Sequence, residues 1–221
     1  ILIDQKLSAD YSKTVNQLRQ CTNTELRTTR AFEGVQHAKY MIFDQRFVFL
    51  GSANFDDRAL THIQELGLVL NNKELVHQAY SIFQHDWSKA TGETSDPIIR
   101  LSAVQLQSIT AALKISPTPK QHIQDSEEEA LLSSVKNAQT LIQLQALSYS
   151  TQNYSGKNWD KLDQALIAAL KRGVCVQIIV SEWSIKETRL EDLKNLENHG
   201  AQIKWMAIPE HSSGSIPYAR V

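Results

Sequence analysis

Six residues between positions 37 and 54 have the types and the spacing to bind and cleave a phosphate ester. They are His37, Lys39, Asp44, Gly51, Ser52 and Asn54. Side chains two positions apart on a β-strand share a face, so His37 and Lys39 are expected to point together. An imidazole can attack phosphorus or transfer a proton near neutral pH. A neighbouring ammonium can stabilise the charge that develops on the phosphoryl oxygens.

Small and neutral residues complete this candidate site. Gly51 and Ser52 let a substrate oxygen approach the backbone, and Ser52 and Asn54 offer neutral hydrogen-bond donors. Lys39, Ser52 and Asn54 are therefore the predicted phosphate ligands, although Ser52 fits an ordinary turn equally well. A carboxylate must hold a catalytic imidazole in the correct tautomer. Glu65 is the candidate for that role or for a salt bridge at a strand end.

Asp44 follows Lys39 by five positions, at the predicted end of the same strand. It completes the set of candidate catalytic residues, which otherwise comprises His37, Lys39, Asn54 and Glu65. A carboxylate at this position is better suited to bracing the strand end or Lys39 than to touching the substrate. We therefore expect Asp44 to have an architectural role in the site.

The spacing H-x-K-x4-D-x6-G-S-x-N resembles the signature of the phospholipase D superfamily, and every position of that signature is filled. The run GSANFDDRALTHIQELGLVL, which contains Glu65, also resembles this family. ALIAALKRGVCVQIIVSEWS resembles the helix–strand unit that precedes each motif in two-motif members. SIPYARV resembles the lead-in to the second motif in the branch that contains lysosomal single-strand exonucleases and poxvirus envelope phospholipase-like proteins.

This resemblance implies a fold, a mechanism and a missing component. The implied fold is α/β, a phospholipase D-like duplicated α/β/α sandwich truncated at both ends. In the implied mechanism, one histidine forms a phosphohistidine, and the histidine of a second motif protonates the leaving oxygen and then activates water or an alcohol. No cofactor and no metal ion are implied. This chain has a single H-x-K, so the second half-site is expected from a missing C-terminal part or from a dimer partner.

Strands and helices alternate along the chain, and their alternation in its second half predicts an α/β domain with a largely parallel sheet. Predicted strands cover 1–4, 36–44, 46–54, 65–70, 140–149, 174–182 and 201–209. Predicted helices cover 8–20, 72–90, 125–139, 158–173 and 188–200, with 56–62 a short helix or a loop. A turn at Asp44 and Gln45 makes a hairpin of the second and third strands.

A loose internal repeat of this strand–helix series predicts two domains. Residues 1–95 are expected to form the C-terminal part of a first phospholipase D-like domain with the motif. Residues 96–122 are turn-rich and are expected to be a crossover linker. Residues 123–221 are expected to form the N-terminal part of a second such domain, ending just before its motif. The chain opens in a strand-like ILID and ends in SIPYARV, so we expect an internal piece of a longer protein.

Composition sets few limits on the function. The 221 residues are 42% hydrophobic and 21% charged, with a formal net charge of -1, which is typical of a globular protein without a global basic field. Cys21 and Cys175 match no metal-site spacing. No apolar run approaches the ~20 residues of a membrane span. The cellular location is not predicted.

The leading functional hypothesis is phosphodiester hydrolysis, including 5′ exonuclease action on single-stranded nucleic acid. The resemblance of SIPYARV favours nucleic acid over phospholipid as the substrate. The alternative within the family is phosphatidyl transfer of the cardiolipin synthase type. The alternative from another class is an inert phospholipase D-like binding or assembly module.

Overall fold

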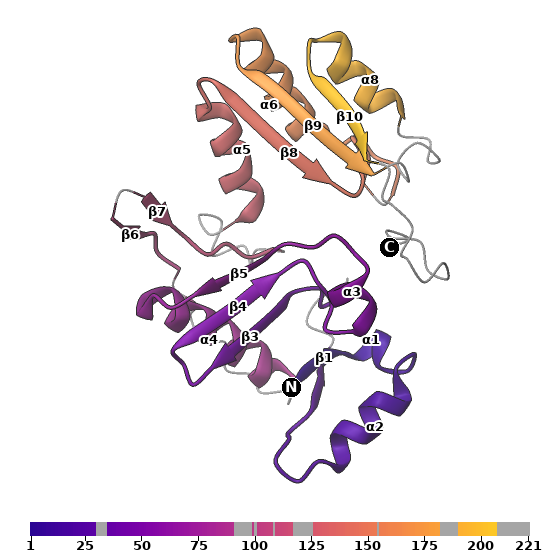
Figure 1. Ribbon diagram of the computed structural model, residues 1–221, viewed down its shortest axis with the longest axis vertical. Helices are drawn as coiled ribbons and strands as arrows, with labels where there is room; N and C mark the ends of the chain where they lie inside the picture. Colours follow the sequence, from indigo (N-terminus) through magenta and orange to yellow (C-terminus); the bar gives the residue numbers. More distant parts are fainter. Residues whose placement is uncertain are drawn as a thin grey trace. The chain divides into compact units, whose positions relative to one another are not determined.

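The computed structural model describes residues 1–29, 35–90, 99, 101–107, 109–116, 126–153, 155–181 and 190–206 (Figure 1). The chain divides into two compact units, which are considered separately below. The first comprises residues 1–60 and 65–113, and the second comprises residues 61–64 and 114–221. The predicted linker at 96–122 falls partly outside the described residues, so the predicted domain boundaries stay a prediction.

The first unit contains a two-stranded parallel sheet, a three-stranded antiparallel sheet and a short hairpin. Its elements are β1 (Leu2–Asp4), α1 (Gln5–Ser8), α2 (Ser12–Gln20), β2 (Arg27–Thr29), β3 (Lys39–Phe43), β4 (Phe47–Gly51), α3 (Asp57–Thr61), β5 (Gly67–Leu70), α4 (Lys73–Lys89), β6 (Val104–Leu106) and β7 (Ile109–Ala111). The β6–β7 hairpin lies within the predicted linker.

The antiparallel sheet of this unit is built from the predicted hairpin. Asp44 and Gln45 both have positive φ, at 52° and 53°, and the Arg46 amide donates to the Phe43 carbonyl at 2.9 Å. Positive φ at both central residues is the geometry of the two-residue turn whose twist suits a hairpin, and aspartate tolerates it better than most residues. The turn fixes the register in which Lys39 lies opposite Gly51.

Helix α4 covers one face of this sheet. Asn72 caps it, because the Asn72 side chain accepts hydrogen bonds from the backbone amides of Glu74 and Leu75. Val76 and Ala79 on the helix pack against Val48, which is fully buried at the centre of β4. This apolar contact anchors the hairpin that carries Lys39.

The second unit is a three-stranded parallel sheet with strand order β10-β9-β8. Its elements are α5 (Glu127–Asn137), β8 (Leu141–Ala146), α6 (Lys161–Lys171), β9 (Cys175–Ser181), α8 (Leu190–Asn198) and β10 (Gln202–Met206). Ser126 caps α5. Gly173 and Gly200 follow α6 and α8 with φ of 87° and 103°, the left-handed conformation that ends many helices.

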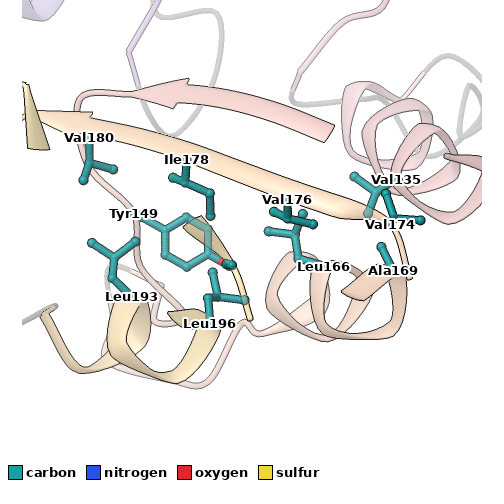
Figure 2. Packing of buried hydrophobic residues seen from close by; sticks show 11 residues of the cluster. Val135, Tyr149, Leu166, Ala169, Val174, Val176, Ile178, Val180, Leu193 and Leu196 are labelled. Carbon is teal, nitrogen blue, oxygen red and sulfur yellow. The ribbon is translucent and has the colours of Figure 1, made fainter. Parts of the chain in front are cut away.

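The core of the second unit lies between β9 and the helices. Val176, Ile178 and Val180 alternate along β9 and point towards side chains of α6 and α8, as Figure 2 shows. Leu166 of α6 and Leu196 of α8 are at most 1% exposed. The strand period of two therefore gives β9 one fully buried face, as its apolar sequence predicts.

The predicted α/β class is confirmed, and so are most of the predicted elements. In both units a strand is followed by a helix and by a second strand that pairs with the first in parallel, β1 with β2 and β9 with β10. This shared order agrees with the predicted internal repeat. Two predictions need correction. The helix expected at 8–20 begins only at Ser12, after the separate short helix α1 and a turn, and the strand expected at 36–44 begins only at Lys39.

Candidate active site

One end of the three-stranded sheet carries four of the motif residues, His37, Lys39, Gly51 and Ser52. Lys39, the first residue of β3, pairs with Gly51, the last residue of β4. Gly51 in turn pairs with Gly67, the first residue of β5. The segments that flank these strand ends carry His37 on one side and Ser52 and Glu65 on the other. The sheet therefore brings together residues that are up to 28 positions apart in the sequence.

His37 and Lys39 lie in direct contact. The Lys39 Nζ is 2.9 Å from Nδ1 and 2.8 Å from Nε2 of the His37 ring. The two side chains thus point together as the spacing predicts, although only Lys39 belongs to the strand. Burial lowers the pKa of His37, and the positive charge of Lys39 lowers that pKa further. A depressed pKa favours the neutral imidazole, the form whose ring lone pair can attack an electrophile.

The Lys39 ammonium also lies in the field of a carboxylate. Burial lowers the pKa of Lys39, and attraction to Glu65 opposes that shift. Glu65 is itself held by Ser52, whose hydroxyl donates to Glu65 Oε2 at 2.5 Å. Among the described residues, Glu65 makes no hydrogen bond to His37. The structure therefore places this carboxylate next to Lys39 and Ser52 and does not place it on the imidazole.

Ser52 connects the end of β4 to the segment that precedes β5. Its backbone amide donates to the Leu66 carbonyl at 3.0 Å, and its hydroxyl accepts from the Leu66 amide at 3.0 Å. Since the hydroxyl proton is directed to Glu65, Ser52 fixes the carboxylate in this state. A direct contact between Ser52 and a substrate phosphate stays a prediction.

Asp44 and Asn54 lie in different places relative to Lys39. Asp44 occupies the turn between β3 and β4, at the opposite end of β3 from Lys39, so the structure does not bring it to the other candidates. Asn54 follows the end of β4 by three residues and is exposed. Of the two, only Asn54 follows the strand end that carries Gly51 and Ser52, and its contact with a substrate phosphate stays a prediction.

Two glycines let β4 and β5 approach closely at the site, and Gly67 was not among the predicted residues. A Cβ added to Gly51 would lie 2.8 Å from the Leu66 carbonyl oxygen and 3.1 Å from the Gly67 Cα. A Cβ added to Gly67 would lie 2.7 Å from the Phe49 ring. Glycine within a strand often marks such an approach, which is the signal that identifies Gly67.

The substitution Gly51→Ala is expected to lower the free energy of unfolding by about 1–3 kcal/mol, because the new methyl group meets backbone atoms that must move. Gly67→Ala is the matched comparison. Its methyl group meets only the Phe49 side chain, which can rotate, so its loss should be smaller. Urea unfolding of both variants checks this order. A larger loss for Gly67→Ala would contradict the proposed packing at the site.

Neither a metal centre nor a membrane helix is evident in the described part of the chain. No three His, Cys, Asp or Glu side chains of the described residues are grouped as metal ligands. None of the described helices has the length and apolar composition that a membrane crossing requires.

Comparison with known proteins identifies the family. Residues 1–87 match the family model described as cardiolipin synthase, PLD-like domain. Phospholipase D Z of Dictyostelium discoideum is 28% identical over 211 residues, which cover 85% of this chain and 50% of that protein. The 5'-3' exonuclease PLD3 of Rattus norvegicus is 30% identical over 219 residues, covering 85% and 44%. The virion nicking-joining enzyme of Vaccinia virus (strain Western Reserve) is 27% identical over 241 residues, covering 95% and 55%.

A solved structure supports the same fold. The phosphatidylserine synthase of Haemophilus influenzae Rd KW20 aligns with a TM-score of 0.51 and 18% sequence identity, over 82% of this chain and 48% of that one. The chain spans about half the length of the curated relatives it matches. Residues 1–87 contain the sheet, the helix α4 and all the motif residues described above. The matched segment, residues 1–87, is therefore a phospholipase D-like domain.

Proposed function

We propose that this chain supplies one half-site for the cleavage of phosphodiesters, with His37 as the nucleophile that forms a phosphohistidine. The observation that carries the proposal is the contact between Lys39 Nζ and the His37 ring, in a setting that lowers the pKa of the imidazole. A neutral ring nitrogen and a cation within hydrogen-bond distance are the two groups that attack on a phosphate anion needs.

In the proposed reaction, a ring nitrogen of His37 attacks phosphorus. A nitrogen–phosphorus bond forms, the phosphorus–oxygen bond to the leaving group breaks, and its electron pair remains on the leaving oxygen. An incoming phosphate oxygen replaces the imidazole as the acceptor for Lys39, which frees the ring nitrogen for attack. Lys39 and Asn54 stabilise the non-bridging oxygens, and Glu65, held by Ser52, keeps the Lys39 ammonium in place.

The leaving oxygen also needs a proton, and the chain's single H-x-K does not provide a second histidine motif for this step. General acid catalysis typically contributes ~10²–10⁴-fold. In the proposal, the acid comes from a second motif in a longer protein or in a partner copy. The chain alone is then expected to turn over ordinary diesters very slowly.

The substrate class we favour is single-stranded nucleic acid, cleaved by hydrolysis. Two of the relatives bear nucleic-acid names, a 5'-3' exonuclease and a nicking-joining enzyme. The name of Phospholipase D Z keeps phospholipid as the second candidate. The chemistry proposed for His37 and Lys39 is the same for both substrates, since each presents a phosphodiester anion.

Reaction with bis(p-nitrophenyl) phosphate tests the half-site without the missing acid, because p-nitrophenolate leaves with little need of a proton. We expect a burst of at most one equivalent of p-nitrophenol per chain, followed by a stall, since nothing activates water to release His37. Single-stranded oligonucleotides should slow the burst by competition more than phosphatidylglycerol vesicles do. The reverse order would favour the lipid substrate, and no burst would favour an inert binding module.

Sustained turnover of an unactivated diester by a strictly monomeric sample would contradict the half-site proposal in another way. It would show that the chain contains its own general acid and that the second motif is dispensable. Analytical ultracentrifugation of the assayed sample supplies the required control for dimers.

A further inference from the structure

The backbone that carries His37 is not held by the sheet. The ladder between β3 and β4 begins with the pair Lys39 and Gly51, and residues 35–38 belong to no strand or helix. The hairpin therefore fixes Lys39 but leaves the two preceding residues without ladder hydrogen bonds. A reactive ring must nevertheless be held near its attack geometry, since a misplacement of 1 Å can cost ~10²-fold in rate.

Gln36, the residue before His37, is bound by two acidic residues from distant elements. Its backbone amide donates to Asp4 Oδ2 at 2.7 Å, and its side-chain Nε2 donates to Asp86 Oδ2 at 3.2 Å. Asp4 ends β1, and Asp86 lies near the end of α4. Both acids are buried, at 8% and 7% exposure.

Each of these carboxylates has a further contact that fixes its orientation. Asp4 Oδ1 accepts from the backbone amide of Lys6 at 2.7 Å. Asp86 Oδ1 lies 3.1 Å from Nδ1 of His85, its neighbour in α4. Hydrogen bonds to carboxylates are stronger than those between neutral groups, and a buried carboxylate that loses one is costly to the folded state. The two acids therefore hold Gln36 through both its backbone amide and its side chain.

We propose that Asp4 and Asp86 are positioning residues that act through Gln36 to set the backbone, and hence the ring, of His37. The two acids hold Gln36, which directly precedes His37. The strand ladder holds Lys39, which is separated from His37 only by Ala38. Asp4 has the larger effect, because it holds the backbone amide, whereas Asp86 holds the side chain. The catalytic meaning of this arrangement rests on the proposed function of His37.

The substitution Asp4→Asn tests this role, with Asp163→Asn as the matched control. Asp163 is also a buried acid, at 6% exposure, which accepts from the Tyr149 hydroxyl and the Asn195 amide in the second unit. We expect Asp4→Asn to slow the p-nitrophenol burst by about 10²-fold, and Asp163→Asn to leave it unchanged. The rate of His37 modification by diethyl pyrocarbonate, which needs no aligned phosphorus, should be the same in both variants. Equal loss of burst rate in both variants would overturn the proposal.

Amide hydrogen exchange at Gln36 provides a readout that does not depend on activity. Exchange at this amide should be slow in the wild type and faster in Asp4→Asn, with no change in Asp163→Asn. Unchanged exchange in Asp4→Asn would overturn the proposal that Asp4 holds the Gln36 backbone. If the wild type gives no burst, the proposed function fails, and the exchange result still decides whether Asp4 holds Gln36.

Gln36→Ala provides the second variant if Asp4→Asn does not fold. It removes the bond to Asp86 and keeps the backbone bond to Asp4, so we expect a smaller loss of burst rate, of about tenfold. An unchanged burst rate in Gln36→Ala would show that Asp86 is not a positioning residue for His37.

Discussion

Replacing His37 by alanine is expected to abolish the p-nitrophenol burst. The substitution removes the atom that is proposed to bond to phosphorus, so no covalent intermediate should form. Removing the nucleophile of another covalent enzyme lowers kcat by roughly 10⁶-fold, a loss that leaves no measurable burst here. Stopped-flow absorbance of p-nitrophenol, with substrate in excess over the chain, provides the measurement.

His77→Ala is the control for the loss of a histidine. His77 is exposed on α4 and lies outside the motif. This variant should keep the full burst, and both variants should unfold at nearly the wild-type urea concentration because both side chains are exposed. A burst that survives in His37→Ala would show that another group attacks phosphorus and that the site has been misassigned.

The substitution Lys39→Met is expected to slow the burst by roughly 10²–10³-fold, the loss seen when one preorganised donor is removed from a developing oxyanion. Methionine keeps much of the length of lysine but lacks its charge. The same change should raise the pKa of His37, because the nearby cation that disfavours the imidazolium form is gone while burial of the ring remains. The acid limb of the burst-rate profile should then move to higher pH.

NMR titration of the His37 ring in the wild type and in Lys39→Met measures this pKa change directly. Lys73→Met, at the exposed start of α4, is the matched control and should leave both the pKa of His37 and the burst rate unchanged. A lower pKa of His37 in Lys39→Met would contradict the electrostatic coupling. An unchanged burst rate would contradict the role of Lys39 in binding the phosphoryl oxygens.

The local part of the site was predictable from the sequence, because it depends on strand period and turn chemistry. The two-residue spacing of His37 and Lys39 predicts that their side chains point together, and they lie in contact although His37 precedes the strand. Asp44 and Gln45 correctly predicted the hairpin turn. The same turn explains why Asp44 lies far from Lys39, since a residue at the tip of a hairpin cannot reach the other end of the strand.

The rest of the site depends on contacts that no local pattern encodes. The hydrogen bond from Ser52 to Glu65 depends on the close approach of β4 and β5 at Gly51 and Gly67. The bond from Asp4 to Gln36 joins residues 32 positions apart and follows from tertiary packing. The strand β2 is absent from the predicted strands, because its three residues, Arg27–Thr29, are too few for an alternating pattern to be visible.

In the proposed reaction, a ring nitrogen of His37 becomes bonded to phosphorus. Tandem mass spectrometry of the chain, digested at alkaline pH after one burst with bis(p-nitrophenyl) phosphate, tests it most directly, because it locates the added mass on a single residue. We expect one p-nitrophenyl phosphoryl group on His37, lost on mild acid treatment and absent from His37→Ala. The same label on another residue, or p-nitrophenol released with no covalent label at any time in the burst, would contradict it.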